Sequence, residues 1–239
     1  MIVLTAFCAV AFALIHVFIG KLTFLQVVPR SRWLSFAGGV SVTYVFMHVL
    51  PELSEHRHSF AKGLEVAAGT AESWVYLVAL AGLVAFYGLE RAVKTSRKAS
   101  RQGNVEAELL WLHISSFVLY NLLVGYLLLH REEPGLMSLL IFAVAMSLHF
   151  VVNDYGLRED QHEQYEAFGR WAIAVAVLAG WLLGALVSLP EVVIGFLFAF
   201  LAGGVVLNVL KEELPEERES RFLPFALGAA LNAVLLLFV

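Results

Sequence analysis

Cysteine, charge and the features of a signal peptide are all scarce in this sequence. Cys8 is the single cysteine among 239 residues, which excludes an internal disulfide and a thiolate metal cluster. Charged residues make up only 15% of the chain, and the net charge of −4 is spread over short segments, which excludes nucleic acid as a partner. The first 20 residues lack a basic start and an A-x-A-like cleavage site, so they predict a first membrane span and not a removable signal.

Apolar residues, in contrast, are abundant. They make up 60% of the chain, and the mean hydropathy is +0.79, whereas soluble domains are about half apolar. We therefore predict an all-α polytopic membrane protein that forms one transmembrane domain, residues 1–239. At roughly 20 residues per span, the chain has room for about eight spans. The segments assigned to them are 2–20, 33–51, 73–90, 109–130, 135–156, 169–189, 191–210 and 222–239.

The basic residues are unevenly distributed between the connecting segments. Of the 16 Lys and Arg residues, 13 follow the first, third, fifth or seventh span. The positive-inside rule then places these connections in the cytoplasm and both termini outside. We expect an integral protein of a bacterial inner or plasma membrane, with the lipid bilayer as its surroundings. The longest connections are predicted to be a solvated outer loop, 52–72, and a basic cytoplasmic loop, 91–108.

Two segments resemble each other. Residues 36–52 read FAGGVSVTYVFMHVLPE and residues 201–216 read LAGGVVLNVLKEELPE, so both open on A-G-G-V and end on L-P-E. They lie in spans predicted to run in opposite directions, which is typical of the inverted repeats of secondary transporters. The pattern predicts a 3+2+3 arrangement, with Glu52 at the outer mouth and Glu216 at the inner one.

Two neighbouring apolar segments carry polar and ionisable side chains. Such groups are costly in hydrocarbon, so each is a functional candidate. The candidates are His113, Tyr120 and Asn121 in 109–130, and His149, Asn153 and Asp154 in 135–156. Imidazole with oxygen donors suits Zn, Fe, Mn, Ni or Cu, and binding without thiolate is weak enough for release.

Each candidate also has a purely structural interpretation. His113 fits a polar residue at the membrane surface, and Tyr120 fits a core aromatic whose hydroxyl finds a partner. Asn121 fits an interhelical hydrogen-bonding residue, and Asp154 fits a helix-terminal carboxylate in water.

Five motifs together resemble those of the ZIP (Zrt/Irt-like) metal-ion transporters. His48–Glu52 is similar to the His-Leu-Leu-Pro-Glu of their second helix, and Glu212–Glu216 to the Glu-Glu-x-x-Pro-Glu of their seventh, with one residue missing. Tyr120–Gly125 and His149–Gly156 take the places of the fourth- and fifth-helix motifs, and Phe86–Glu90 resembles the end of the third helix. The resemblance implies eight spans, a 3+2+3 repeat and a homodimer.

The resemblance also implies an altered metal centre. Tyr120 stands for the family's fourth-helix histidine, Val124 and Phe150 for carboxylates, and Val152 for a proline. The donors retained are Asn121, His149 and Asp154, with Asn153 as a weaker substitute. A centre with so little negative charge returns little Coulomb energy for dehydrating a divalent ion.

The leading hypothesis is a ZIP-like passive carrier of zinc or a similar divalent ion into the cytoplasm. The ion is the transported substrate, no cofactor is required, and no enzyme activity is expected; the chain has no G-x-x-x-x-G-K loop for nucleotide hydrolysis. Ions would enter past His48 and Glu52. They would bind around His149, Asn153 and Asn121, and leave past Asp154, Glu212 and Glu216.

Two alternatives remain open. The chain is then either a ZIP-like protein that moves another solute or acts as a regulatory partner, or an intramembrane zinc hydrolase built on His149, Asp154 and His113. The hydrolase lacks an H-E-x-x-H motif and is the weaker of the two.

Overall fold

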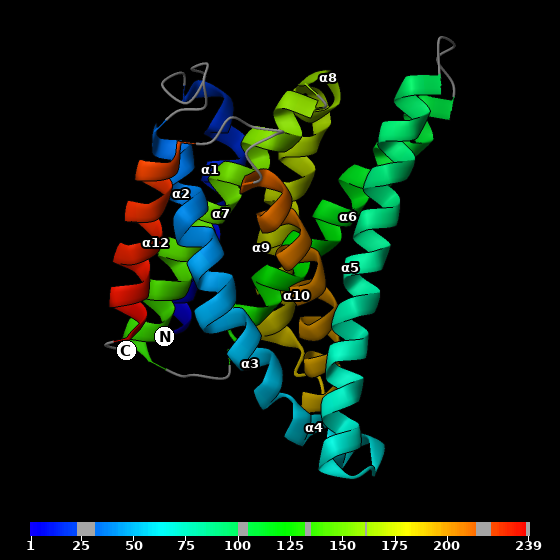
Figure 1. Ribbon diagram of the computed structural model, residues 1–239, viewed down its shortest axis with the longest axis vertical. Helices are drawn as coiled ribbons and strands as arrows, with labels where there is room; N and C mark the ends of the chain where they lie inside the picture. Colours follow the sequence, from blue (N-terminus) through cyan, green and yellow to red (C-terminus); the bar gives the residue numbers. More distant parts are fainter. Residues whose placement is uncertain (23–31, 100–104, 132–134, 161, 214–220, 238–239) are drawn as a thin grey trace.

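The computed structural model describes residues 1–22, 32–99, 105–131, 135–160, 162–213 and 221–237 (Figure 1). Of His113 and Glu212 only the backbone is described. The described residues form helices and no strands, because a helix satisfies every backbone polar group without help from the lipid.

The long helices follow the apolar segments, and short helices and turns connect some of them. In chain order the elements are α1 (Ile2–Phe18), the 3-10 turn η1 (Ile19–Lys21), α2 (Arg32–Tyr44), the π-helical turn η3 (Val45–Val49), α3 (Leu50–Glu55), α4 (Arg57–Leu64), α5 (Ala68–Ala99), α6 (Val105–Leu127), α7 (Leu136–Asp160), α8 (His162–Gln164), the π-helical turn η4 (Tyr165–Gly169), α9 (Arg170–Leu186), α10 (Glu191–Glu213) and α12 (Phe222–Leu237).

Within the described residues, six helical stretches are long and apolar enough to cross a membrane. They are Ile2–Lys21, Arg32–Leu64, Ala68–Ala92, Leu136–Glu159, His162–Leu186 and Glu191–Lys211. Two shorter apolar stretches, Ile114–Leu127 and Phe222–Leu237, lie where the fourth and eighth spans are predicted. The helical membrane architecture is therefore confirmed, and the count of eight spans stays a prediction. Both termini lie at the same end of the bundle (Figure 1).

The prediction of a loop for residues 52–72 is wrong, because most of this segment is helical. It contains α3, α4 and the start of α5. His56, expected in a solvated segment, is only 3% exposed and packs its ring on Phe198 of α10 at 4.9 Å. Phe60 of α4 is buried against Phe196, with ring centroids 4.3 Å apart. These aromatic contacts pack the segment against α10 and stabilise its helical structure.

The predicted boundaries of the cytoplasmic loop 91–108 also change. α5 continues from the apolar segment to Ala99, and α6 begins at Val105, so most of this stretch is helical as well. Lys and Arg have high helix propensity, and a basic sequence is therefore no signal for a helix end.

Helices α2 and α12 touch through their backbones. A Cβ atom added to Gly39 of α2 would lie 2.1 Å from the carbonyl oxygen of Phe225 in α12, and one added to Gly228 would lie 2.1 Å from that of Phe36. Small residues at helix interfaces are typical of membrane proteins, where close van der Waals packing replaces the hydrophobic drive.

Two further helix pairs repeat this reciprocal contact. Gly125 of α6 and Gly180 of α9 each face a carbonyl of the other helix, and so do Gly82 of α5 and Gly203 of α10. The added Cβ atoms would lie 1.9 to 2.1 Å from those oxygens. The three glycine-mediated pairs are α2–α12, α6–α9 and α5–α10, and α7 packs against α1, α2 and α10.

We predict that Gly180→Ala destabilises the protein, because its Cβ would lie 1.9 Å from the carbonyl oxygen of Leu122. Overpacking of this kind typically costs about 1–3 kcal/mol. The matched control is Gly88→Ala on α5, where no atom lies within 4 Å of the added Cβ. Thermal unfolding of the purified protein in detergent measures both variants, and equal unfolding temperatures would contradict the packing described.

Candidate functional site

The centre of the bundle holds buried polar side chains from α6 and α7. His149, Asn153 and Asp154 of α7 are each 5% exposed or less, and Tyr120 and Asn121 of α6 are buried as well. The ring centroids of Tyr120 and His149 lie 6.1 Å apart in a T-shaped arrangement. All five side chains thus lie inside the protein and away from lipid, where an uncompensated polar group would be costly.

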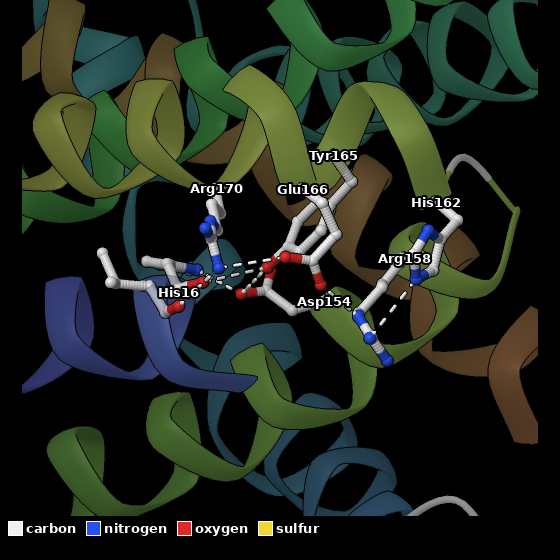
Figure 2. Close-up of polar contacts among 8 residues, drawn as sticks. His16, Asp154, Arg158, His162, Tyr165, Glu166 and Arg170 are labelled. Carbon is white, nitrogen blue, oxygen red and sulfur yellow. Dashed lines mark hydrogen bonds and ion pairs between the residues drawn. The ribbon is translucent and has the colours of Figure 1, made fainter. Parts of the chain in front are cut away.

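Asp154 is held by residues from two other parts of the chain. The Nδ1–H of His16 in α1 donates to its Oδ2 at 2.6 Å, and the Tyr165 hydroxyl of η4 lies 3.0 Å from the same oxygen (Figure 2). That hydroxyl also lies 3.1 Å from the His16 carbonyl oxygen. His16 is 0% exposed and Asp154 is 1% exposed, so neither exchanges this contact for water.

Sequence reasoning missed His16 and Tyr165. A histidine inside the apolar segment 2–20 is a signal of the same kind as His149, and it was available from the sequence. Tyr165 carries no such signal, because a tyrosine in a polar connecting segment is ordinary. Asp154 is therefore paired in the protein interior and does not end a helix in water.

A second polar group lies beside this one, nearer the end of the bundle. Glu166 of η4 forms ion pairs with Arg158 of α7 and with Arg170 of α9, the latter at 2.9 Å (Figure 2). These side chains are 19% to 26% exposed. The pairs join η4 to both neighbouring helices and hold the turn that carries Tyr165.

Several polar atoms at the centre have no hydrogen-bond partner among the described residues. Asn121 donates through Nδ2 to the Phe117 carbonyl of its own helix at 3.0 Å, which leaves its Oδ1. The other such atoms at the centre are Nε2 of His16, the Tyr120 hydroxyl, Nε2 of His149, Nδ2 of Asn153 and Oδ1 of Asp154. Each unsatisfied buried group costs about 1–3 kcal/mol, so six together point to a polar ligand or water at this place.

The donors are too dispersed for a compact metal centre in this conformation. Within the described residues, no three His, Cys, Asp or Glu side chains come together as a metal ligand set. Phe150 is one reason: it is fully buried, and its ring centroid lies 4.7 Å from that of His16 and 6.1 Å from that of His149. An apolar ring thus stands beside both imidazoles.

A pocket opens toward the other end of the bundle. His48 and Glu52 line it, together with Glu55 of α3 and Arg131 after α6, and its volume is about 110 Å³. The His48 Nε2 and a Glu52 carboxylate oxygen are 3.5 Å apart. Burial lowers the pKa of Arg131 from its ordinary value, although a guanidinium stays charged in proteins. The pocket therefore combines two carboxylates with one cation.

Polar residues at both ends of the bundle lie on π-helical turns. His48 belongs to η3, whereas Tyr165 and Glu166 belong to η4. π-Helical turns are rare and often occur at functional sites, because the extra residue in the turn redirects a side chain.

Three predicted residues cannot be located by their side chains. The backbones of His113 and Glu212 lie in α6 and in the last turn of α10, and Glu216 lies outside the described residues. Their predicted parts in binding and release stay predictions.

Comparison with known proteins gives no support for any assignment. No protein-family model, no curated protein and no solved structure matches this chain.

We predict that His16→Leu strongly destabilises the protein, because it leaves the Asp154 carboxylate buried with the Tyr165 hydroxyl alone. Breaking a buried pair in this way typically costs about 3–5 kcal/mol. The double variant His16→Leu/Asp154→Leu removes both polar groups and should recover most of the loss. Thermal unfolding in detergent gives the comparison, with His58→Leu, an exposed histidine, as control. If the loss of stability in the double variant equalled the sum of the losses in the two single variants, the pairing would be ruled out.

Proposed function

We propose that this protein is a ZIP-like secondary carrier that moves a divalent metal ion, zinc or a similar ion, across the membrane into the cytoplasm. The observation that carries the proposal is the set of six buried polar atoms without a protein partner at the centre of the bundle. The imidazole nitrogens, the Asn121 amide oxygen, the Tyr120 hydroxyl and the Asp154 carboxylate oxygen in that set are ligands that such ions accept. The Asn153 amide nitrogen, in contrast, donates N–H and would hold a ligand's water or oxygen. The ion is the substrate, and nothing in the proposal requires a cofactor.

The route has a polar group at three levels. The pocket at His48 and Glu52 serves as the outer mouth, and the central residues around His149 serve as the binding site. The ion leaves toward the ion pairs of Glu166, past Asp154. Lys and Arg are concentrated on that second side, which the positive-inside rule assigns to the cytoplasm.

Helix packing supports the 3+2+3 inverted repeat. The repeat equates the second span with the seventh and the third with the eighth, so it exchanges the pair α2–α12 with the pair α10–α5. Both pairs have reciprocal glycine contacts, and each includes a glycine of an A-G-G-V segment, Gly39 or Gly203. Two equivalent helix pairs of this kind allow one repeat to move against the other during alternating access.

Weak binding is the expected consequence of this chemistry. The central group contains one carboxylate, and Asp154 is already paired with His16. An ion therefore gains less Coulomb energy than at a centre with several carboxylates, and its dwell time is short. Placement in a bacterial membrane and a homodimeric state belong to the same proposal.

We predict that proteoliposomes containing the protein accumulate Zn²⁺ above the level of empty vesicles, measured by mass spectrometry of the washed vesicles. His149→Ala should lower the initial rate at least about tenfold, because loss of a metal-site residue commonly has effects of that size. The control is His58→Ala, which removes an exposed imidazole and should leave the rate unchanged. Uptake equal to that of empty vesicles would refute the carrier.

A second candidate is a ZIP-like protein that does not transport metal and serves another solute or a regulatory partner. The observation that favours it is the absence, within the described chain, of three His, Cys, Asp or Glu side chains close enough to share a metal ion. Tyr120, Val124 and Phe150, which stand where the resemblance implies ligands, are all buried at the centre.

The second candidate predicts that restoring those ligands creates a new activity. The triple variant Tyr120→His/Val124→Glu/Phe150→Glu should take up Zn²⁺ when the parent does not, because the centre gains an imidazole and two carboxylates. Circular dichroism checks that the variant folds, and the uptake assay compares it with its parent. A parent that already transports as fast as the variant would exclude this candidate.

A further inference from the structure

An open groove lies between the N-terminal ends of α2 and α12. Its volume is about 720 Å³, which falls in the range of about 300–1,000 Å³ typical of ligand sites. The two helices lie side by side and both begin at the same end of the bundle (Figure 1). The lining residues are Arg32, Trp33 and Phe36 of α2, and Arg221, Leu223, Pro224 and Leu227 at the start of α12.

The walls of this groove are fixed to each other. The backbone N–H of Arg221 donates to the Ser35 hydroxyl at 3.0 Å, which ties the start of α12 to α2. Farther along, Asn232 donates through Nδ2 to the Val40 carbonyl at 3.1 Å, and Thr43 donates to the Ala229 carbonyl at 3.2 Å. With the close backbone approach at Gly39, these bonds make the groove a preformed feature. A ligand that enters it does not have to separate the helices.

The lining changes from charged to apolar along the helices. Arg32 is exposed and Arg221 is partly exposed at the end of the bundle, and Trp33 is 66% exposed beside them. Leu223 and Leu227 follow, and both side chains are exposed. The described lining residues include no carboxylate, so their formal charge is positive. Tryptophan is typical of the headgroup level, which places the guanidinium groups at phosphate depth.

We propose that this groove binds an anionic phospholipid. Its phosphate lies against the guanidinium groups of Arg32 and Arg221, and one acyl chain lies along Leu223 and Leu227. Arginine binds phosphate with parallel N–H donors, and basic pockets between transmembrane helices are suited to anionic headgroups. The guanidinium groups alone would suit a free phosphate. The apolar wall beside them favours a ligand that also has an acyl chain. This inference is independent of any transport activity.

Lipid binding to the purified full-length protein in detergent tests the proposal, with native mass spectrometry as the readout. The probes are dioleoylphosphatidylglycerol, dioleoylphosphatidylcholine and glycerol 3-phosphate. Phosphatidylglycerol should bind tighter than phosphatidylcholine, and Arg32→Gln/Arg221→Gln should weaken it about thirtyfold, since each basic residue near an anionic headgroup contributes about 1 kcal/mol. Leu227→Trp keeps both arginines and fills the groove, and it should also weaken lipid binding.

The matched control is Arg57→Gln/Lys62→Gln, which removes two charges from α4, away from the groove. It should leave the preference for phosphatidylglycerol unchanged, and unfolding curves for every variant identify any that fails to fold. Equal binding of the two phospholipids, or an unchanged preference in both groove variants, overturns the proposal. Glycerol 3-phosphate bound as tightly as the lipid overturns it in favour of a phosphate site. A dimer that dissociates in Leu227→Trp overturns it in favour of a second copy of the chain.

Discussion

A carboxylate buried in a membrane protein needs compensating partners, and the pairing of Asp154 satisfies that need with groups from distant parts of the chain. His16 of α1 and Tyr165 of η4 both contact the same oxygen of Asp154 on α7. Breaking such a pair costs several kcal/mol, so the three elements are held in a fixed relation. The adjoining ion pairs of Glu166 extend this relation to α9. The position of the central polar residues of α7 therefore depends on the contact of Asp154 with His16 and Tyr165.

Helix packing provides the second constraint, and it acts between the backbones of paired helices. In lipid there is little hydrophobic drive between helices, so backbones that approach at Gly39, Gly125 and Gly203 gain van der Waals contact instead. These contacts hold three helix pairs together, and α7 packs against α2 and α10, which belong to two of these pairs. The polar residues of α7 are then enclosed without requiring polar partners for all of them. The glycine contacts between paired helices stabilise the fold, so the polar atoms at the centre do not all need a protein partner.

Charge and aromatic packing together determine what the centre can bind. One oxygen of the Asp154 carboxylate is already engaged by His16, and the apolar ring of Phe150 lies against the imidazoles of both His16 and His149. In the pocket lined by His48 and Glu52, Arg131 offsets part of the charge of Glu52 and Glu55. A weakly held cation fits these features, and so does a protein that binds no metal.

The sequence alone determined the helical architecture, the apolar segments that the long helices follow, and the placement of His149 well inside one of them; it left open whether Asp154 is buried. These follow from hydropathy and from local spacing along one helix, because hydrocarbon excludes polar groups wherever they occur. The tertiary structure alone decided that Asp154 pairs with His16, 138 positions earlier, and that the segment around His56 packs on α10. Periodicity specifies which face of a helix is buried, but it carries no information on which distant helix covers that face. That choice is made by the packing of side chains across the whole bundle.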